Sequence, residues 1–457
     1  MQCSPLIIIG LMLLTGFTSI PVQANTIPDL PEPLTAQDFR PFDEARAKIG
    51  QQLFYDKILS GNRNIACATC HHHELASGDG LSLGIGEGGL GLGTNREPGE
   101  GESAATRRIQ RNAPALFNLG AKEFNVLFHD GRLSLDDTHP KGFNSPAVEF
   151  IPDGLQSLLA AQAVFPLVSE VEMAGHVDEN EVAGARNRRI DYAWRIIEER
   201  IQNVSTYAEG FTVAFPDIEH NTDIKIHHIA NVLDDFMNSE WRTPNSPFDQ
   251  YLQGQKDALT PDQLAGMQLF YGKANCYQCH SGKLQTDHQF HSIGLPQFGP
   301  GRTRQFDFKA RDMGRINESD RREDAYRFRT PSLRNVTATA PYGHNGAYKD
   351  LRRIIEHHLN PLQALSSWTP QQLILPEFTK VSHGDYLIQQ DSQEWQRLKK
   401  SIDIQPVSLD KTEVDALLSF LETLTDTYSL QGRLGIPDTV GSGLSENTRV
   451  DHSNSDN

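Results

Sequence analysis

Apolar residues recur at helical spacing along much of the chain, and strict alternation of apolar and polar positions is scarce. The spacing is close to 3.6 residues in four segments, which predicts helices over residues 187–202, 224–240, 350–359 and 411–424. A further helix is expected directly after Thr260, because Thr260-Pro261-Asp262-Gln263 combines a capping box with proline at the first helical position. The pattern therefore predicts an all-α fold with irregular loop insertions.

Several short motifs occur twice, at a nearly constant distance. The pairs are 50–55 with 266–271, 67–71 with 276–280, 114–119 with 331–336, and 129–131 with 344–346. Their offsets are 216, 209, 217 and 215 residues. This self-similarity predicts two tandem copies of one domain. We expect an N-terminal domain over 25–243, a C-terminal domain over 244–430 and a disordered tail over 431–457.

The first residues are typical of an export signal. Residues 6–14 read LIIIGLMLL, an apolar run too short to span a bilayer, which needs about 20 residues. Val22-Gln23-Ala24 then offers small residues at the positions of a cleavage site. We therefore predict a signal peptide over residues 1–24 and a periplasmic, not membrane-embedded, protein; a signal anchor is the alternative.

The charge balance narrows the class of partner. The chain has 457 residues with 42 basic and 59 acidic side chains, giving a formal net charge of −17. A surface that binds nucleic acid needs a basic excess, so we expect no nucleic-acid partner. Hydrophobic residues make up 38% of the chain, which is enough for a sizeable core.

Cysteine spacing gives the clearest chemical signal. Cys3 lies within the predicted signal peptide, and the other four cysteines form two copies of the pattern C-x-x-C-H. The copies are Cys67, Cys70 and His71, and Cys276, Cys279 and His280. Two thiols three positions apart can each add to one vinyl group of a porphyrin, and the adjacent histidine then binds the iron.

Three other uses of four cysteines are weaker. A redox-active C-x-x-C pair would not require histidine at the fifth position twice, and a four-cysteine zinc site would need neither histidine. Plain disulfides are compatible with an exported chain. The repeated histidine favours two covalently bound c-type haems, one in each domain.

The motifs together identify a resemblance. Their set comprises Arg111-Asn112-Ala113-Pro114, Phe128-His129-Asp130-Gly131-Arg132, Val171-Glu172-Met173, and Thr330 to Asn335 followed by Thr339 to Tyr342. With the two haem motifs they resemble the bacterial di-haem cytochrome c peroxidases and their MauG-type relatives, over roughly residues 36–430. The resemblance implies two cytochrome c-like domains, with a peroxidatic haem at His71 and an electron-transfer haem at His280.

The resemblance also implies further site residues. Glu172 matches a glutamate that acts as acid and base beside the open face of the peroxidatic iron, and Glu170 is the alternative. The family holds a Ca2+ between its domains through one asparagine side chain and two backbone carbonyls. The matching positions are Asn112, Thr339 and Pro341.

Three positions depart from the peroxidase pattern. Glu87 occupies the place of a histidine that caps the peroxidatic iron in many relatives, so we expect that haem to be open or weakly capped by carboxylate. His129 replaces the usual tryptophan between the haems. His358 occupies the place of the sixth ligand of the second haem and lies on the apolar face of its predicted helix, whereas His357 is expected on the polar face. Met313 is the rival ligand.

These implications predict a periplasmic di-haem c-type peroxidase. It would reduce hydrogen peroxide to water with electrons from a small electron-transfer protein, such as cytochrome c, passed through the second haem. A MauG-type oxidase that acts on a partner protein is the first alternative, and a non-enzymatic di-haem electron carrier is the second. The sequence identifies neither the donor, the protein substrate, nor the oligomeric state.

Overall fold

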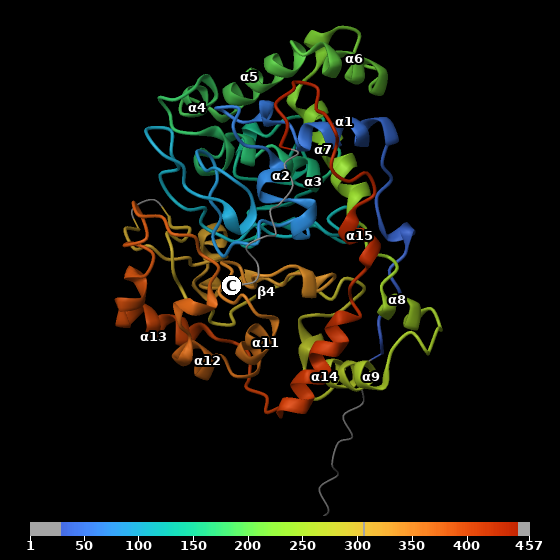
Figure 1. The fold of residues 1–457 in the computed structure, drawn as a ribbon, viewed down its shortest axis with the longest axis vertical. Helices are drawn as coiled ribbons and strands as arrows, with labels where there is room; N and C mark the ends of the chain where they lie inside the picture. Colours follow the sequence, from blue (N-terminus) through green and yellow to red (C-terminus); the bar gives the residue numbers. More distant parts are fainter. Residues whose placement is uncertain (1–28, 305–306, 447–457) are drawn as a thin grey trace, which may run out of the picture.

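The computed structural model describes residues 29–304 and 307–446, and it is mostly helical, as predicted (Figure 1). The predicted signal peptide lies outside the described residues. The helices are α1 Glu44–Phe54, α2 Cys67–Cys70, α3 Leu158–Ala163, α4 Glu181–Arg186, α5 Ile190–Gln202, α6 Ser205–Ala214, α7 Ile226–Glu240, α8 Pro247–Leu252, α9 Pro261–Tyr271, α10 Ile316–Ser319, α11 Leu351–Leu359, α12 Pro361–Ser367, α13 Ser392–Ser401, α14 Lys411–Glu422 and α15 Thr427–Gln431. Long irregular segments join them.

The strands are short and form two small antiparallel sheets. They are β1 Val126–Leu127, β2 Leu133–Leu135, β3 Phe143–Asn144, β4 Phe290–His291 and β5 Phe328–Arg329. The first sheet has the order β1-β2-β3, with Leu127 opposite Leu133 and Leu135 opposite Phe143. In the second sheet β4 pairs with β5, and Phe290 lies opposite Arg329.

The predicted helices correspond to α5, α7, α11 and α14, and the capped helix after Thr260 is α9. The Thr260 hydroxyl accepts from the backbone N–H of Gln263 at 3.4 Å, and the Gln263 side chain accepts from the N–H of Thr260 at 2.9 Å. The segment 187–202 becomes helical only from Ile190, because α4 ends at Arg186 and a turn follows. Periodicity and capping chemistry therefore located these helices.

A close helix pair organises the first half of the molecule. Helices α1 and α7 approach so closely at Gly50 that a Cβ atom there would lie 1.9 Å from the carbonyl oxygen of Val232. Phe54 at the end of α1 packs against Phe236 and Trp241, with ring centres 5.2 and 5.5 Å away. Only glycine leaves room for this contact.

The second half contains the same arrangement. A Cβ atom on Gly266 of α9 would lie 1.9 Å from the carbonyl oxygen of Ala416 in α14, and Phe270 packs against Phe420 with ring centres 5.2 Å apart. In Figure 1 the α1–α7 pair lies in the upper part and the α9–α14 pair in the lower part. The repeated G-x-x-L-F-Y motif therefore corresponds to a repeated helix packing.

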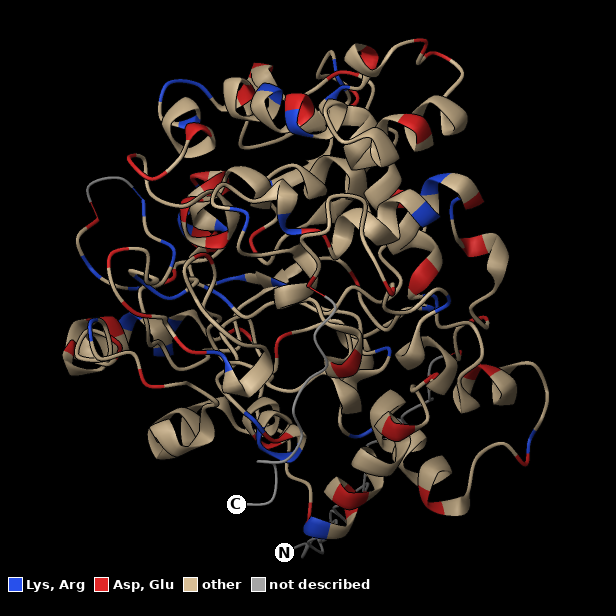
Figure 2. Cartoon of the chain, turned by 45° about the horizontal axis from the view of Figure 1, so that its top comes forward, with Lys and Arg blue, Asp and Glu red and all other residues tan. Residues whose placement is uncertain are grey.

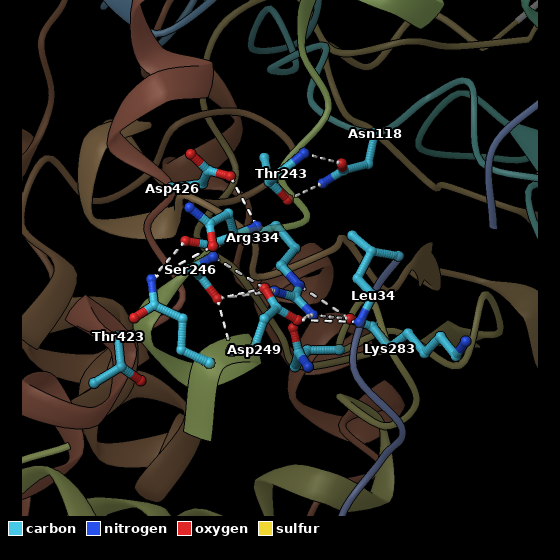
Figure 3. A network of polar contacts seen from close by, with 12 residues as sticks. Leu34, Asn118, Thr243, Ser246, Asp249, Lys283, Arg334, Thr423 and Asp426 are labelled. Carbon is cyan, nitrogen blue, oxygen red and sulfur yellow. Dashed lines mark hydrogen bonds and ion pairs between the residues drawn. The ribbon is translucent and has the colours of Figure 1, made fainter. Parts of the chain in front are cut away.

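A buried polar network surrounds the connection between the two halves (Figure 3). Arg334 and Asp249, both fully buried, form an ion pair, and Asp249 also accepts from the backbone N–H of Leu34 at 3.1 Å. Nearby, Thr243 and Asn118 exchange two hydrogen bonds of 2.8 and 2.9 Å. The network fastens the N-terminal segment and the connection before α8 to the second half.

The chain also crosses between the halves elsewhere. Leu83, from the loop after the first C-x-x-C-H motif, packs in the apolar core of the second half. Arg108 forms an ion pair with Asp385 at 3.0 Å, and both side chains are almost completely buried. The loop is thereby anchored in the opposite half of the molecule.

The segment after α15 folds back onto the first half, so the predicted disordered tail is wrong for residues 431–446. Val440 is buried in the core around α1 and α7. The Ser442 side chain donates to Asp56, and the backbone N–H of Glu446 donates to the carbonyl of Tyr55 at 2.7 Å. The polar composition of this segment suggested disorder, but its polar groups form hydrogen bonds with buried residues of the first half. Residues 447–457 lie outside the described residues.

The surface carries charges of both signs. Figure 2 shows acidic and basic residues distributed over both halves of the molecule. Within residues 29–304 and 307–446, no helix combines the length and apolar character that crossing a membrane requires.

We expect Gly50→Ala and Gly266→Ala each to lower the free energy of unfolding by about 1–3 kcal/mol or more, because the new methyl group meets backbone atoms that cannot move aside. Gly210→Ala in α6 is the matched control. Its methyl group would lie 3.5 Å from the Ile49 side chain, and alanine suits a helix interior better than glycine. Urea unfolding followed by circular dichroism measures the three variants. A comparable loss in Gly210→Ala would contradict the close-contact explanation.

Candidate functional site

The first C-x-x-C-H motif presents two thiols and an imidazole along one helical turn. Cys67 begins α2, Cys70 ends it and His71 follows as the capping residue. Burial raises the pKa of both cysteine thiols to about 12, which keeps them protonated. The Nδ1 atom of His71 lies 3.0 Å from the carbonyl oxygen of Ser77, so it must be the donor. This hydrogen bond orients the ring and leaves Nε2 available as a ligand.

The second motif reproduces this geometry. Nδ1 of His280 donates to the carbonyl of Gln285 at 3.0 Å, which again leaves Nε2 available. Burial, with a smaller contribution from neighbouring His358, lowers the pKa of His280 to about 4. A neutral imidazole is the form that binds iron.

The described structure excludes two of the alternative uses of the cysteines. Cys67, Cys70, Cys276 and Cys279 form no disulfide. The cysteine pairs do not come together either, because the one potential metal-binding group in the described residues is Cys279 with Asp287 and His291. Two separate thiol pairs, each beside a carbonyl-oriented imidazole, fit the covalent attachment of one haem each.

His358 lies opposite His280. The two ring centres are 6.3 Å apart, and Nδ1 of His358 donates to the carbonyl of Ile354 at 2.8 Å. A metal bound to two imidazoles at about 2.0–2.1 Å holds their ring centres roughly 6 Å apart. The observed separation therefore has room for one iron atom between the rings, with Nε2 of His358 left for it.

His357 is buried, so its predicted position on the polar face of the helix is wrong. Its Nδ1 atom is 2.8 Å from the hydroxyl of Tyr348, and its Nε2 atom is 2.7 Å from the carbonyl of Ile293. Helix α11 contacts both α12 and α14, so more than one of its faces is covered. Both ring nitrogens of His357 are occupied, which leaves neither for iron.

Met313 lies in a separate apolar cluster. Its neighbours there are Tyr326, Leu365, Leu398, Ala325 and Trp395. Cys276, which begins the second motif, instead packs against the core around α9 and α14.

Glu172 and Glu170 share one π-helical turn, Glu170–Ala174, but have different surroundings. Glu170 forms ion pairs with Arg107 at 2.8 Å and Arg186 at 3.6 Å near the surface. Within the described residues, the Glu172 carboxylate has no hydrogen-bond or ion-pair partner. Its charge adds to the effect of burial in raising the pKa of Cys70, so it lies beside the first motif.

The glycine-rich loop that contains Glu87 packs against the same turn. A Cβ atom on Gly86 would lie 1.9 Å from the carbonyl oxygen of Val171. The Glu87 carboxylate accepts from the side-chain amides of Asn62 and Asn64, each at 2.7 Å. Arg96 fastens the loop by donating to its backbone carbonyls. The carboxylate is therefore held by amide groups within the protein.

His72 and His73, which directly follow the first motif, are buried. Nδ1 of His73 is 2.5 Å from the hydroxyl of Tyr55, and its Nε2 is 2.9 Å from the carboxylate of Glu240. Glu240 lies far along the chain, at the end of α7, so the residues around His73 in the sequence do not indicate this contact. We call Tyr55, His73 and Glu240 the tyrosine triad.

A buried ionic network joins the two halves. The Arg111 guanidinium donates to Asp312 at 2.6 and 2.9 Å and to Asp130 at 2.8 Å. Asp130 also pairs with Arg132 and Arg302 at 3.1 Å. Burial raises the pKa of both carboxyl groups, but the guanidinium groups outweigh it and hold each pKa below its usual range.

Two histidines and one phenylalanine accompany this network. Nε2 of His129 is 3.4 Å from the carbonyl of Asn112, and burial lowers the pKa of His129 to about 4. The ring of His344 stacks on Phe328 with centres 3.5 Å apart, and burial lowers its pKa to about 3. Both imidazoles are therefore neutral near neutral pH.

Comparisons with known proteins agree with this geometry. Residues 44–257 match the family model for di-haem cytochrome c peroxidase. The chain is 26% identical to the cytochrome-c peroxidase IdrP2 of Pseudomonas sp. (strain SCT), over 84% of this chain and 93% of that protein. It is 29% identical to the methylamine utilization protein MauG of Paracoccus denitrificans (strain Pd 1222), over 87% and 92%.

A solved structure shares the fold. It is the crystal structure of a MauG-like protein associated with microbial copper homeostasis, with a TM-score of 0.58 and 24% identity over 90% of this chain and 97% of that one. Two haem-attachment sites in a mostly helical chain define a di-haem c-type protein. The chain matches the di-haem cytochrome c peroxidase family over residues 44–257, and this confirms the resemblance drawn from its motifs. The family implies two c-type haems.

We expect Arg111→Met to lower the free energy of unfolding by about 3–5 kcal/mol, because it leaves Asp130 and Asp312 without their shared buried cation. Arg107→Met is the control, since its exposed pair with Glu170 contributes about 0–1 kcal/mol.

The loss in Arg111→Met should shrink in acid. The pKa of each carboxyl group is lower in the folded state, so the contribution of the pair is present near neutral pH and is lost as the pH falls through the folded-state values. Denaturant unfolding at several pH values measures both variants. Equal losses at all pH values would argue against the ionic network.

Proposed function

We propose that the protein is a periplasmic di-haem c-type peroxidase that reduces hydrogen peroxide to water. The observation that carries the proposal is the difference between the two motifs. The ring centre of His358 lies 6.3 Å from that of His280, whereas the carboxylate of Glu172, unpaired within the described residues, lies near the first motif. One centre then has two protein ligands, and the other has an acid–base group for a small substrate. The proposed domains are 25–243 for the peroxidatic haem and 244–430 for the electron-transfer haem.

The haem held by Cys67, Cys70 and His71 would supply peroxide binding and electron transfer when bound. The overall reaction takes H2O2, two electrons and two protons to two molecules of water. Glu172 accepts the proton that peroxide loses and gives it to the departing oxygen. A carboxylate can take up and release a proton, and within the described residues no hydrogen bond or ion pair occupies the oxygens of Glu172.

His280 and His358 would hold the second haem, which receives electrons for the reaction. Two neutral imidazole ligands give a lower reduction potential than a methionine ligand does. The Arg111 network keeps the two halves in fixed contact between the motifs. His129 and the stacked pair of Phe328 and His344 lie in this region. A fixed separation between the centres is what electron transfer between them requires.

A Ca2+ between the halves completes the proposed centre. The backbone N–H of Asn112 donates to the carbonyl of His344 at 2.9 Å, which brings Asn112 close to the segment that contains Thr339 and Pro341. The side-chain amide nitrogen of Asn112 donates to Leu81 at 2.7 Å. Its side-chain oxygen is the atom left for a hard cation, which prefers oxygen ligands.

The proposed location and donor follow from sequence and charge. The signal peptide over residues 1–24 would direct the protein to the periplasm. A net charge of −17, with acidic residues on both halves (Figure 2), suits a small basic electron-transfer protein such as a cytochrome c.

Two observations favour a second function, that of a MauG-type oxidase of a partner protein. The histidine opposite His280 would make the second haem a weak acceptor from a high-potential cytochrome, and amide groups hold Glu87 where many peroxidases have a capping histidine. Rapid mixing with H2O2 and reduced cytochrome c separates the functions. Fast oxidation of the cytochrome supports the peroxidase, and a long-lived oxidised protein without it supports the oxidase. No reaction would support an electron carrier.

We expect Glu172→Gln to slow the reaction with H2O2 by about 10²–10⁴-fold, because the amide cannot carry the proton. Glu170→Gln is the matched control and should react at nearly the normal rate, since Glu170 forms surface ion pairs. Stopped-flow absorption at the haem bands measures the rate. A near-normal rate in Glu172→Gln would assign the acid–base role to another group.

We expect His358→Ala to remove the low-spin signal of the second haem in electron paramagnetic resonance (EPR) spectra, because the ligand opposite His280 is lost. Met313→Leu should leave the signal unchanged, since Met313 packs in a separate cluster. The opposite result, an unchanged signal in His358→Ala and a changed one in Met313→Leu, would make methionine the ligand.

A further inference from the structure

We propose that Tyr55 is a redox-active tyrosine that gives one electron to the first haem centre after peroxide has oxidised it. His73 takes the phenol proton in the same step, and Glu240 stabilises the resulting imidazolium. This role rests on the proposed peroxidase function and extends it, because no residue of the triad belongs to the site described for that function.

The three side chains form a continuous hydrogen-bonded chain in the protein interior. The hydroxyl of Tyr55 is 2.5 Å from Nδ1 of His73, and Nε2 of His73 is 2.9 Å from Oε1 of Glu240. The exposed fractions are 0%, 5% and 2%. A carboxylate only accepts hydrogen bonds, so Nε2 carries the proton and Nδ1 accepts from the phenol.

Glu240 is held in place as a carboxylate. It accepts from the backbone N–H groups of Leu434 and Gly435 at 2.8 and 2.7 Å, in addition to His73. These donors come from the segment that folds back after α15. The carboxylate is therefore fixed opposite the imidazole and compensates the positive charge that His73 gains.

The step balances without a further reagent. Oxidised tyrosine is a strong acid, so a buried phenol loses its electron readily only when its proton has a partner. The O–H bond of Tyr55 breaks, its proton forms a new N–H bond at Nδ1 of His73, and its electron goes to the centre that H2O2 has oxidised. One electron from the small donor, together with the proton on His73, later restores the phenol.

The triad lies directly beside the first haem motif. His73 is two residues after His71, and the ring of Tyr55 lies 6.2 Å from that of His72. Trp241 packs on His73 with ring centres 4.9 Å apart. The electron therefore has a short route through packed rings and backbone to the first motif.

The second half of the chain provides an internal comparison. Tyr271 ends the second G-x-x-L-F-Y motif as Tyr55 ends the first, but within the described residues its hydroxyl has neither an imidazole nor a carboxylate partner. The two C-x-x-C-H motifs are 209 residues apart, and this offset places Gly282 where the first half has His73. The helix packing matches Phe420 with Phe236, which places Leu424 where the first half has Glu240. The repeated fold forms without the triad, which the described part of the chain contains only in the half proposed to react with peroxide.

The test is rapid freeze-quench EPR of the di-haem holoprotein after one equivalent of H2O2, with protein that contains ring-deuterated tyrosine as the label. We expect a radical whose hyperfine splitting changes with the label. It should be lost in Tyr55→Phe and retained in Tyr271→Phe, and it should form more slowly in D2O because a proton moves with the electron. Glu240→Gln and His73→Gln should both slow the formation of the radical. Because glutamine at position 240 still accepts a hydrogen bond, Glu240→Gln removes the charge and leaves a hydrogen-bonding group in place.

Two results overturn this role, and they are distinguishable. Normal peroxide oxidation of the haem with no tyrosyl signal, or with the same signal in Tyr55→Phe, overturns the role of Tyr55 alone and leaves the triad as a structural brace. No change in haem absorption on addition of H2O2 to the wild-type holoprotein overturns the proposed function, and the role of Tyr55 with it. Haem content and thermal unfolding of each variant identify a loss of signal that is due to misfolding.

Discussion

The contact of Arg111 with Asp130 and Asp312 is the constraint on which the relation between the two halves depends. One guanidinium group pairs with two buried carboxylates, one from each half, so neither half can move away without exposing or stranding a charge. Because hydrogen bonds and ion pairs have defined geometry, this contact also fixes how the two segments lie against each other.

The repeat keeps one scaffold and changes what surrounds each imidazole. Gly50 and Gly266 allow the same helix contact, and His71 and His280 make the same hydrogen bond to a backbone carbonyl. The differences lie opposite and beside these histidines. His358 faces one of them, while a carboxylate and a buried tyrosine accompany the other. The two halves therefore differ in the side chains placed on a shared backbone scaffold.

Local signals were sufficient for the helices and the haem motifs, because periodicity, caps and cysteine spacing depend on neighbours in the sequence. Local signals did not indicate burial that depends on distant partners. The ring of His73 is buried against Glu240, 167 residues away, and the ring of His357 is buried against Ile293, 64 residues away. The polar segment after α15 is ordered because Asp56 and Tyr55 bind it, which composition does not reveal. The site roles of Glu172, His358 and Asn112 came from the family resemblance and remain predictions.

The return of residues 431–446 to the first half has a consequence for biosynthesis. A chain is synthesised from its N-terminus, and domains generally fold in that order. Here the backbone groups of Leu434 and Gly435 that hold Glu240 follow it in the chain by 194 and 195 residues. The interior of the first half is therefore complete only after the second half has been synthesised. A product that stopped before residue 431 would keep the first cysteine pair but lack the segment that holds Glu240.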